Sequence, residues 1–140
     1  MEIKIKKLSS DAVLPSYAHE DDAGMDLFSV EDVLIAKGQR VQISTGIAVE
    51  IPAGHVGLIW DKSGLSHKYG LKTLGGVIDA SYRGEIKVGM INLGDEDYKI
   101  EKGHKVAQMI IQEKIAMEIM EVSELVDGLR GESGFGSTGK

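Results

Sequence analysis

The sequence predicts an all-β protein, and three observations support this fold class. Apolar residues alternate with polar residues in short runs, turn-forming residues separate these runs, and helical periodicity is weak. The chain has 140 residues, of which 42% are hydrophobic and 27% are charged. This length and composition are typical of one globular domain that buries a substantial core.

Each alternating run predicts one strand. In chain order these runs are residues 3–5, 41–43, 47–51, 56–60, 86–90 and 115–119. Residues 106–111 are more continuously apolar, which predicts a strand covered on both faces. We expect one or two helical turns at 63–69 and at 123–126, where Ser123 can cap the start of the second.

Composition and charge exclude several classes of protein. The chain has no cysteine, which excludes disulfide scaffolds, thiolate zinc sites and cysteine nucleophiles. Its net charge of −6 argues against a nucleic-acid partner, but a few cations and backbone N–H groups still suffice for a small anionic ligand. No apolar run is long enough to span a membrane, and the N-terminal residues alternate unlike a signal peptide. We therefore expect a cytoplasmic protein without a membrane partner.

The glycine-rich end of the chain, residues 130–140, breaks the strand pattern. It contains four glycines and a single apolar residue, Phe135, so it cannot bury enough surface to offset its ordering entropy. Either it is a tail without a role, or it is a flap that orders over a ligand. Phe135 favours the flap, because it lies between Arg130 and two hydroxyl residues. Residues 134–140 also match most of a phosphate-binding P-loop, but no helix follows them, so we do not expect that fold.

Two carboxylates and one short turn could carry chemistry. Asp79 lies in a predicted β-hairpin over residues 75–88, where it either forms the turn or acts as a general base. Asp26 is flanked by apolar residues and needs a partner, either in a structural salt bridge or in a functional site. Ser63 and Gly64 either cap a short helix or donate to an anion.

Taken together, five segments resemble the motifs of the trimeric dUTP pyrophosphatase (dUTPase) family. They are AGMDLFS (23–29), WDKSGLS (60–66), GGVIDASYRGEIKV (75–88), KGHKVAQMII (102–111) and RGESGFGSTG (130–139). The resemblance implies a distorted jelly-roll or β-clip barrel over residues 1–129, with residues 130–140 as a flexible lid. It further implies a homotrimer whose active sites lie between subunits, each closed by a neighbour's lid.

The resemblance also implies a reaction and its cofactor. The substrate is dUTP, which is hydrolysed to dUMP and pyrophosphate with Mg²⁺ on the triphosphate. This reaction keeps uracil out of DNA and supplies dUMP for thymidylate synthesis. No protein side chain would bind the metal directly, although Asp26 could contact its water shell.

The motifs imply a role for each matched residue. Asp79 activates the attacking water, and Tyr82 packs under the deoxyribose, where it excludes a 2′-hydroxyl. The backbone of Gly76 and Val77 pairs with uracil, and Phe135 stacks on it. The remaining substrate-binding positions are Lys62, Ser63, Gly64, Gln108, Arg130, Gly136, Ser137 and Thr138, and the supporting positions are Asp26 and Arg83.

Two departures and two alternatives accompany this resemblance. Asp61-Lys62 stands where the family commonly has Pro-Arg, and Thr73 stands where many members have asparagine. The related dCTP deaminases need a glutamate ten residues after Asp79, where this chain has Gly89. A nucleotide sensor without activity is the alternative from another class, and measuring pyrophosphate release from dUTP separates the three hypotheses.

Overall fold

The computed structural model describes residues 1–129 and 131–132. The expectations for the proposed lid therefore fall largely outside the described residues. This applies to Arg130, Phe135, Gly136, Ser137 and Thr138.

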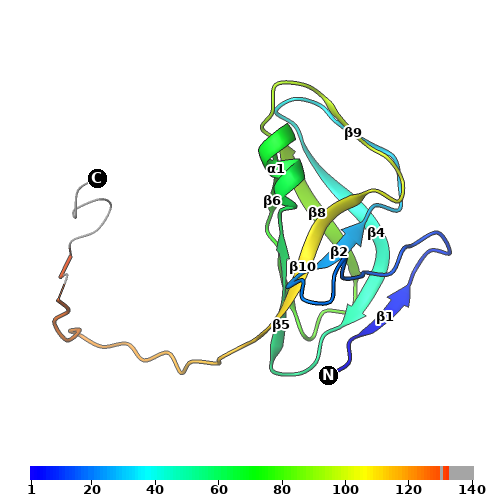
Figure 1. The fold of residues 1–140 in the computed structure, drawn as a ribbon. Coiled ribbons are helices and arrows are strands. Elements are labelled where there is room, and N and C mark those ends of the chain that lie inside the picture. Colours follow the sequence, from blue (N-terminus) through cyan, green and yellow to red (C-terminus); the bar gives the residue numbers. More distant parts are fainter. Residues whose placement is uncertain (130, 133–140) are drawn as a thin grey trace.

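Two four-stranded antiparallel sheets and one short ribbon form the body of the molecule (Figure 1). The first sheet has the order β1 (Lys4–Lys7), β4 (Arg40–Glu50), β8 (Glu85–Asn92), β6 (Leu71–Leu74). The second has the order β2 (Met25–Phe28), β10 (Lys105–Glu113), β5 (His55–Trp60), β7 (Val77–Asp79). The ribbon pairs β3 (Val33–Ile35) with β9 (Tyr98–Ile100), and α1 (Ser63–Tyr69) is the single helix of the described residues.

The core follows the period-two pattern of the sequence. In β8, Ile86, Val88 and Met90 are buried, whereas Lys87 between them is exposed. Side chains such as Leu27 of β2 join them in one apolar cluster. The predicted all-β class with a short helix at 63–69 is confirmed.

β4 replaces two predicted strands. We expected separate strands at 41–43 and 47–51, but Arg40–Glu50 is continuous, with an irregular register against β8 between Ser44 and Ala48. Gly46 lies within this irregularity at φ +67°, a conformation that glycine adopts without strain. Its N–H donates to Glu85 Oε1 at 3.0 Å. Gly46 therefore lies in a β-bulge that bends one continuous strand, and it does not form a turn that ends the strand.

The predicted hairpin over 75–88 is wrong in its pairing. β7 pairs with β5, and β8 pairs with β4 and β6, so the two strands belong to different sheets. The apolar face of β8 packs into the core from the first sheet. β7 forms an edge of the second sheet. Residues 80–84 therefore connect two sheets.

Residues 114–129, which we call the arm, do not form the predicted strand or helix. The chain runs away from the body after β10 (Figure 1). Ile115, Met117 and Ile119 alternate as in a strand, yet they are 83%, 77% and 96% exposed. A strand requires a partner for its backbone groups. The Lys114 N–H donates to the Gly54 carbonyl at 2.8 Å, but no strand of the described residues pairs with the arm.

Among the described residues there is no helix with the length and apolarity needed to cross a membrane.

Candidate functional site

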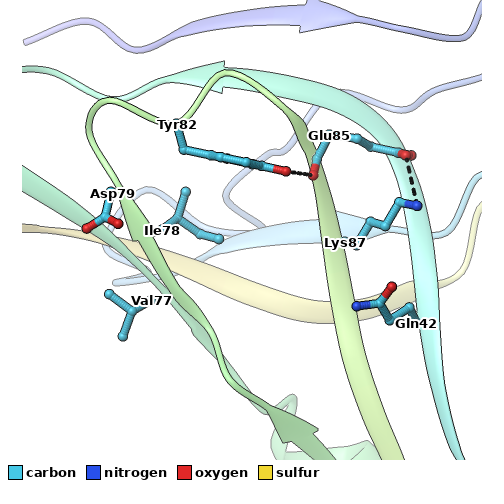
Figure 2. A pocket seen from close by; sticks show the side chains of 7 residues that line it. All are labelled: Gln42, Val77, Ile78, Asp79, Tyr82, Glu85 and Lys87. Atoms are coloured by element: carbon cyan, nitrogen blue, oxygen red, sulfur yellow. Dashed lines mark hydrogen bonds and ion pairs between the residues drawn. The ribbon is translucent and has the colours of Figure 1, made fainter.

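The first candidate region is a cavity of about 470 Å³ beside the connection from β7 to β8 (Figure 2). Asp79 ends β7, and its side chain is exposed. Figure 2 shows no hydrogen bond or ion pair between its carboxylate and the other lining side chains. Such a carboxylate can accept a proton from water. The cavity is lined by Gln42, Val77, Ile78, Asp79, Tyr82, Glu85 and Lys87.

The connection over residues 79–84 fixes the position of Tyr82, which lines the cavity. The Tyr82 hydroxyl donates to the Glu85 carbonyl at 3.0 Å. The backbone N–H of Tyr82 donates to the Asp79 carbonyl at 3.0 Å. A Cβ at Gly84 would lie 2.3 Å from the tyrosine oxygen, so this ring position requires glycine. Arg83 donates to the carbonyls of Ala80 at 2.6 Å and Tyr82 at 2.8 Å, which fits a supporting role.

Val77 lines the cavity of Asp79, whereas Gly76 lines a neighbouring cavity that also contains Val77, Trp60 and Thr73. Gly76 has φ +107°, and a Cβ there would lie 2.7 Å from the Ile59 carbonyl. Its own carbonyl accepts from Ile59 N–H at 2.8 Å. Because β7 is the edge of its sheet, its outward N–H and C=O groups are available to a ligand.

The second candidate region is a charged cluster around Asp26, which is 2% exposed. Lys62 donates to Oδ1, and Lys105 Nζ lies 2.6 Å from Oδ2, an ion pair whose angle is poor for a hydrogen bond. Burial alone would raise the pKa of Asp26, but the contacts with Lys105 and Lys62 outweigh it and hold the pKa below its ordinary value. Asp26 therefore makes the salt bridge that was one of its two predicted roles.

Gln108 joins this cluster to the turn before α1. Its position on β10 pairs with Asp26 on one side and with Trp60 on the other. Its Nε2 donates to the Asp61 carbonyl at 2.8 Å. A Cβ at Gly24 would lie 2.5 Å from its side-chain oxygen, so the buried glycine makes room for the amide.

The turn itself presents Lys62, Ser63 and Gly64. Lys62 is the N-cap of α1 and makes no side-chain cap, and Ser63 is the first helical residue, so the predicted capping role of Ser63 is wrong. Ser63 and Gly64 are exposed. Their N–H and hydroxyl groups can donate to a ligand.

The two positions that depart from the resembled motifs lie in contact. Asp61 Oδ1 accepts from Thr73 N–H at 2.7 Å and from the Thr73 hydroxyl at 2.6 Å. The Thr73 hydroxyl therefore donates its proton within the protein. Burial would raise the pKa of Asp61, but hydrogen bonds from Lys72 and Thr73 hold it below its ordinary value.

One chain does not bring the two regions together. Asp79 pairs with Val56 near the start of β5, whereas Gln108 pairs with Trp60 at its end. These points are about 13 Å apart at about 3.3 Å per residue along a strand. The predicted base and the predicted phosphate contacts therefore lie in separate regions of a single chain.

Sequence reasoning missed several residues of both regions. Gln42 reaches the cavity from β4, where it pairs with Gly89 of β8, and no local pattern reveals that contact. Lys87 and Glu85 follow the predicted alternation of β8, which indicated a face but not a cavity. Lys105 lies inside the motif over residues 102–111, but its ion pair with Asp26 was not predicted.

Comparison with known proteins decides the family. The family model described as dUTPase matches residues 10–139. The deoxyuridine 5′-triphosphate nucleotidohydrolase of Clostridium kluyveri is 52% identical over 141 residues, covering 99% of each chain. The chain belongs to the dUTPase family. The sequence resemblance to dUTPases is thereby confirmed.

Solved dUTPase structures share the fold. The dUTPase of Staphylococcus bacteriophage 80alpha with dUpNHpp is 33% identical and covers 99% of each chain at a TM-score of 0.93. A dUTPase from phage phi11 of S. aureus, 31% identical, covers 89% of this chain and 98% of its own at a TM-score of 0.83. That phi11 structure concerns the coordination of a structural Mg(II) ion.

Proposed function

We propose that this protein hydrolyses dUTP to dUMP and pyrophosphate. Family membership and the dUpNHpp-bound phage relative support the substrate class. The observation that carries the proposal is the exposed Asp79 carboxylate beside the Tyr82 ring in one cavity. The nucleotide pool of the cytoplasm is where we expect the enzyme to work.

Asp79 is the proposed general base. Its carboxylate takes a proton from the water that attacks phosphorus, and the bond to the departing pyrophosphate breaks. Tyr82 packs under the deoxyribose and leaves no room for a 2′-hydroxyl. The edge of β7 at Gly76 and Val77 offers its backbone groups to uracil, whose pattern of donors and acceptors differs from that of cytosine.

The charged cluster and the lid are the proposed holders of the triphosphate. Lys62, Ser63, Gly64 and Gln108 contribute from the body, supported by Asp26. Five residues outside the described part of the chain complete the proposed set. Arg130, Ser137 and Thr138 contact the phosphates, Phe135 stacks on uracil, and Gly136 is a further substrate-binding position.

Mg²⁺ is the proposed cofactor, carried by the triphosphate. Within residues 1–129 and 131–132, no group of three or more His, Asp or Glu side chains could hold a metal ion. Both oxygens of Asp26 already face lysine ammonium groups, so they fit direct ligation of Mg²⁺ poorly. When bound to the substrate, the ion would neutralise phosphate charge.

We propose a homotrimer in which each active site combines residues of different chains. The separation of Asp79 from Gln108 along β5 supports this, because a neighbour can supply the missing half. The arm supports it as well, since its exposed apolar alternation lacks a partner among the described residues. Sedimentation that gave the monomer mass of 15.1 kDa at working concentrations would contradict the proposal.

The decisive experiment measures product release. Purified protein with Mg²⁺ should release pyrophosphate and dUMP from dUTP, with little turnover of dTTP, dCTP or UTP. Ammonia released from dCTP would instead favour the deaminase alternative, which Gly89 on β8 argues against because it offers no carboxylate. Tight binding of dUTP without hydrolysis would favour the sensor alternative.

A further inference from the structure

The connection from β5 to α1 is only two residues long and is held from outside the helix. β5 ends at Trp60 and α1 begins at Ser63. The N-cap residue makes no side-chain cap, and the first turn carries no acidic residue. A seven-residue helix without a cap has little intrinsic stability, so tertiary contacts must fix where it starts.

The Asp61 side chain supplies such contacts to β6. Oδ1 accepts two hydrogen bonds from Thr73, at 2.7 Å from the N–H and at 2.6 Å from the hydroxyl. Oδ2 accepts from Lys72 Nζ at 2.8 Å. Thr73 is 8% exposed, so its N–H has little access to water if the carboxylate is removed.

The backbone of Asp61 is tied to the other sheet. Its carbonyl accepts from Gln108 Nε2 of β10 at 2.8 Å. The next residue, Lys62, donates to the buried Asp26 of β2. The short connection is therefore fixed to β6 of the first sheet and to β10 and β2 of the second.

We propose that Asp61 is a positioning residue for phosphate binding. It holds the connection so that Lys62, Ser63 and Gly64 present their donors in one arrangement before substrate arrives. Asp61 itself touches no substrate, since its carboxylate oxygens are occupied by Thr73 and Lys72. The inference rests on the proposed function and adds to it a residue whose side chain faces into the protein.

The test compares four variants of the full-length protein. Asp61→Ala removes the acceptor, Asp61→Asn keeps an acceptor for Thr73, and Thr73→Val removes only the hydroxyl bond. Asp95→Ala is the matched control, because Asp95 also pairs with a lysine, Lys37 at 3.4 Å, but is fully exposed. Each variant is assayed for KM and kcat with dUTP and, without ligand, for amide hydrogen exchange.

Misplaced phosphate donors weaken ground-state binding. We expect Asp61→Ala to raise KM about 10-fold with kcat changed less than about 3-fold. Asp61→Asn should restore KM to within about 3-fold of wild type, and Thr73→Val should raise it about 3-fold. Adding Thr73→Val to Asp61→Ala should raise KM no further, because the two residues share one interaction. Asp95→Ala should behave as wild type.

Hydrogen exchange keeps the test independent of activity. The N–H of Ser66 donates to the Lys62 carbonyl at 2.9 Å, and the N–H of Thr73 donates to Asp61. Both amides should exchange faster in Asp61→Ala and at nearly the normal rate in Asp61→Asn.

If wild type does not hydrolyse dUTP, the proposed function fails, and unchanged exchange in Asp61→Ala would overturn the positioning role of Asp61 as well. Faster exchange with unchanged KM in an active enzyme would reduce Asp61 to a structural role and overturn the inference. If Asp61→Ala does not fold, Thr73→Val and Asp61→Asn still decide it through KM and exchange.

Discussion

Asp79 and Asp26 are carboxylates of the same enzyme in opposite surroundings. Asp79 is exposed at the end of an edge strand, beside a cavity of about 470 Å³. Asp26 lies on β2, the opposite edge strand of the same sheet, but it is 2% exposed and faces two lysines. A carboxylate that faces two cations resists protonation, whereas the exposed Asp79 carboxylate is open to water and substrate. Environment rather than residue type therefore separates the proposed base from the supporting residue.

The largest expected effect comes from Asp79→Asn. Because the amide cannot accept the proton of the attacking water, kcat should fall at least ~10²-fold. The exposed position predicts that the melting temperature and the binding of a nonhydrolysable dUTP analogue change little. Near-normal turnover in this variant would remove Asp79 from the role of base.

Deletion of residues 130–140 tests a contribution outside both regions. Loss of Arg130, Ser137 and Thr138 should lower hydrolysis by on the order of 10²-fold, because their charge stabilisation matters most as pyrophosphate departs. Thermal stability and oligomer mass should be nearly unchanged. A truncated protein that unfolds, or that keeps full activity, would contradict the proposed lid.

Tyr82→Ala should change selectivity more than rate. Without the ring, the cavity no longer excludes a 2′-hydroxyl, so the preference for dUTP over UTP should fall about 10-fold. The ratio of the two kcat/KM values measures this effect. Equal use of UTP and dUTP by wild type would show that the tyrosine does not select the sugar.

Asp26→Asn should lower the stability of the fold more than it lowers kcat, which is the opposite of the effect expected for Asp79→Asn. It removes a charge that holds Lys62 and Lys105, and we expect a loss of about 2 kcal/mol in the free energy of unfolding. Urea denaturation at one fixed protein concentration measures it. An Asp26 variant as stable as wild type would show that the two lysines need no partner.

The smallest expected effect is the pH dependence of that contribution. The folded-state pKa of Asp26 is lowered, so its stabilisation is complete above the ordinary carboxyl pKa and is lost as pH falls further. Below about pH 4 the stability of wild type should therefore fall more steeply than that of Asp26→Asn. Parallel curves for the two proteins would assign the pH dependence to other groups.

The alternation of apolar and polar residues was sufficient to predict individual strands of the core. The alternation of Ile86, Val88 and Met90 predicted β8, and the turn signals around it predicted a strand-rich domain. Asp79 and Tyr82, which both lie in the third motif, line one cavity in the structure. The same alternation at Ile115, Met117 and Ile119 predicted a strand that does not form in this chain. A period of two shows that a segment can be a strand, whereas a partner decides whether it becomes one.

Tertiary structure alone decided which residues meet. The sequence by itself determined the all-β class, the short helix at Ser63–Tyr69 and the dUTPase motifs, because each depends on neighbours within a few positions. It could not determine that β7 and β8 join different sheets, or that Gln42 reaches the cavity of Asp79. Nor could it reveal that Asp61 and Thr73 share hydrogen bonds. These contacts depend on strand pairing between distant segments, which is set by how all the apolar faces close around one core.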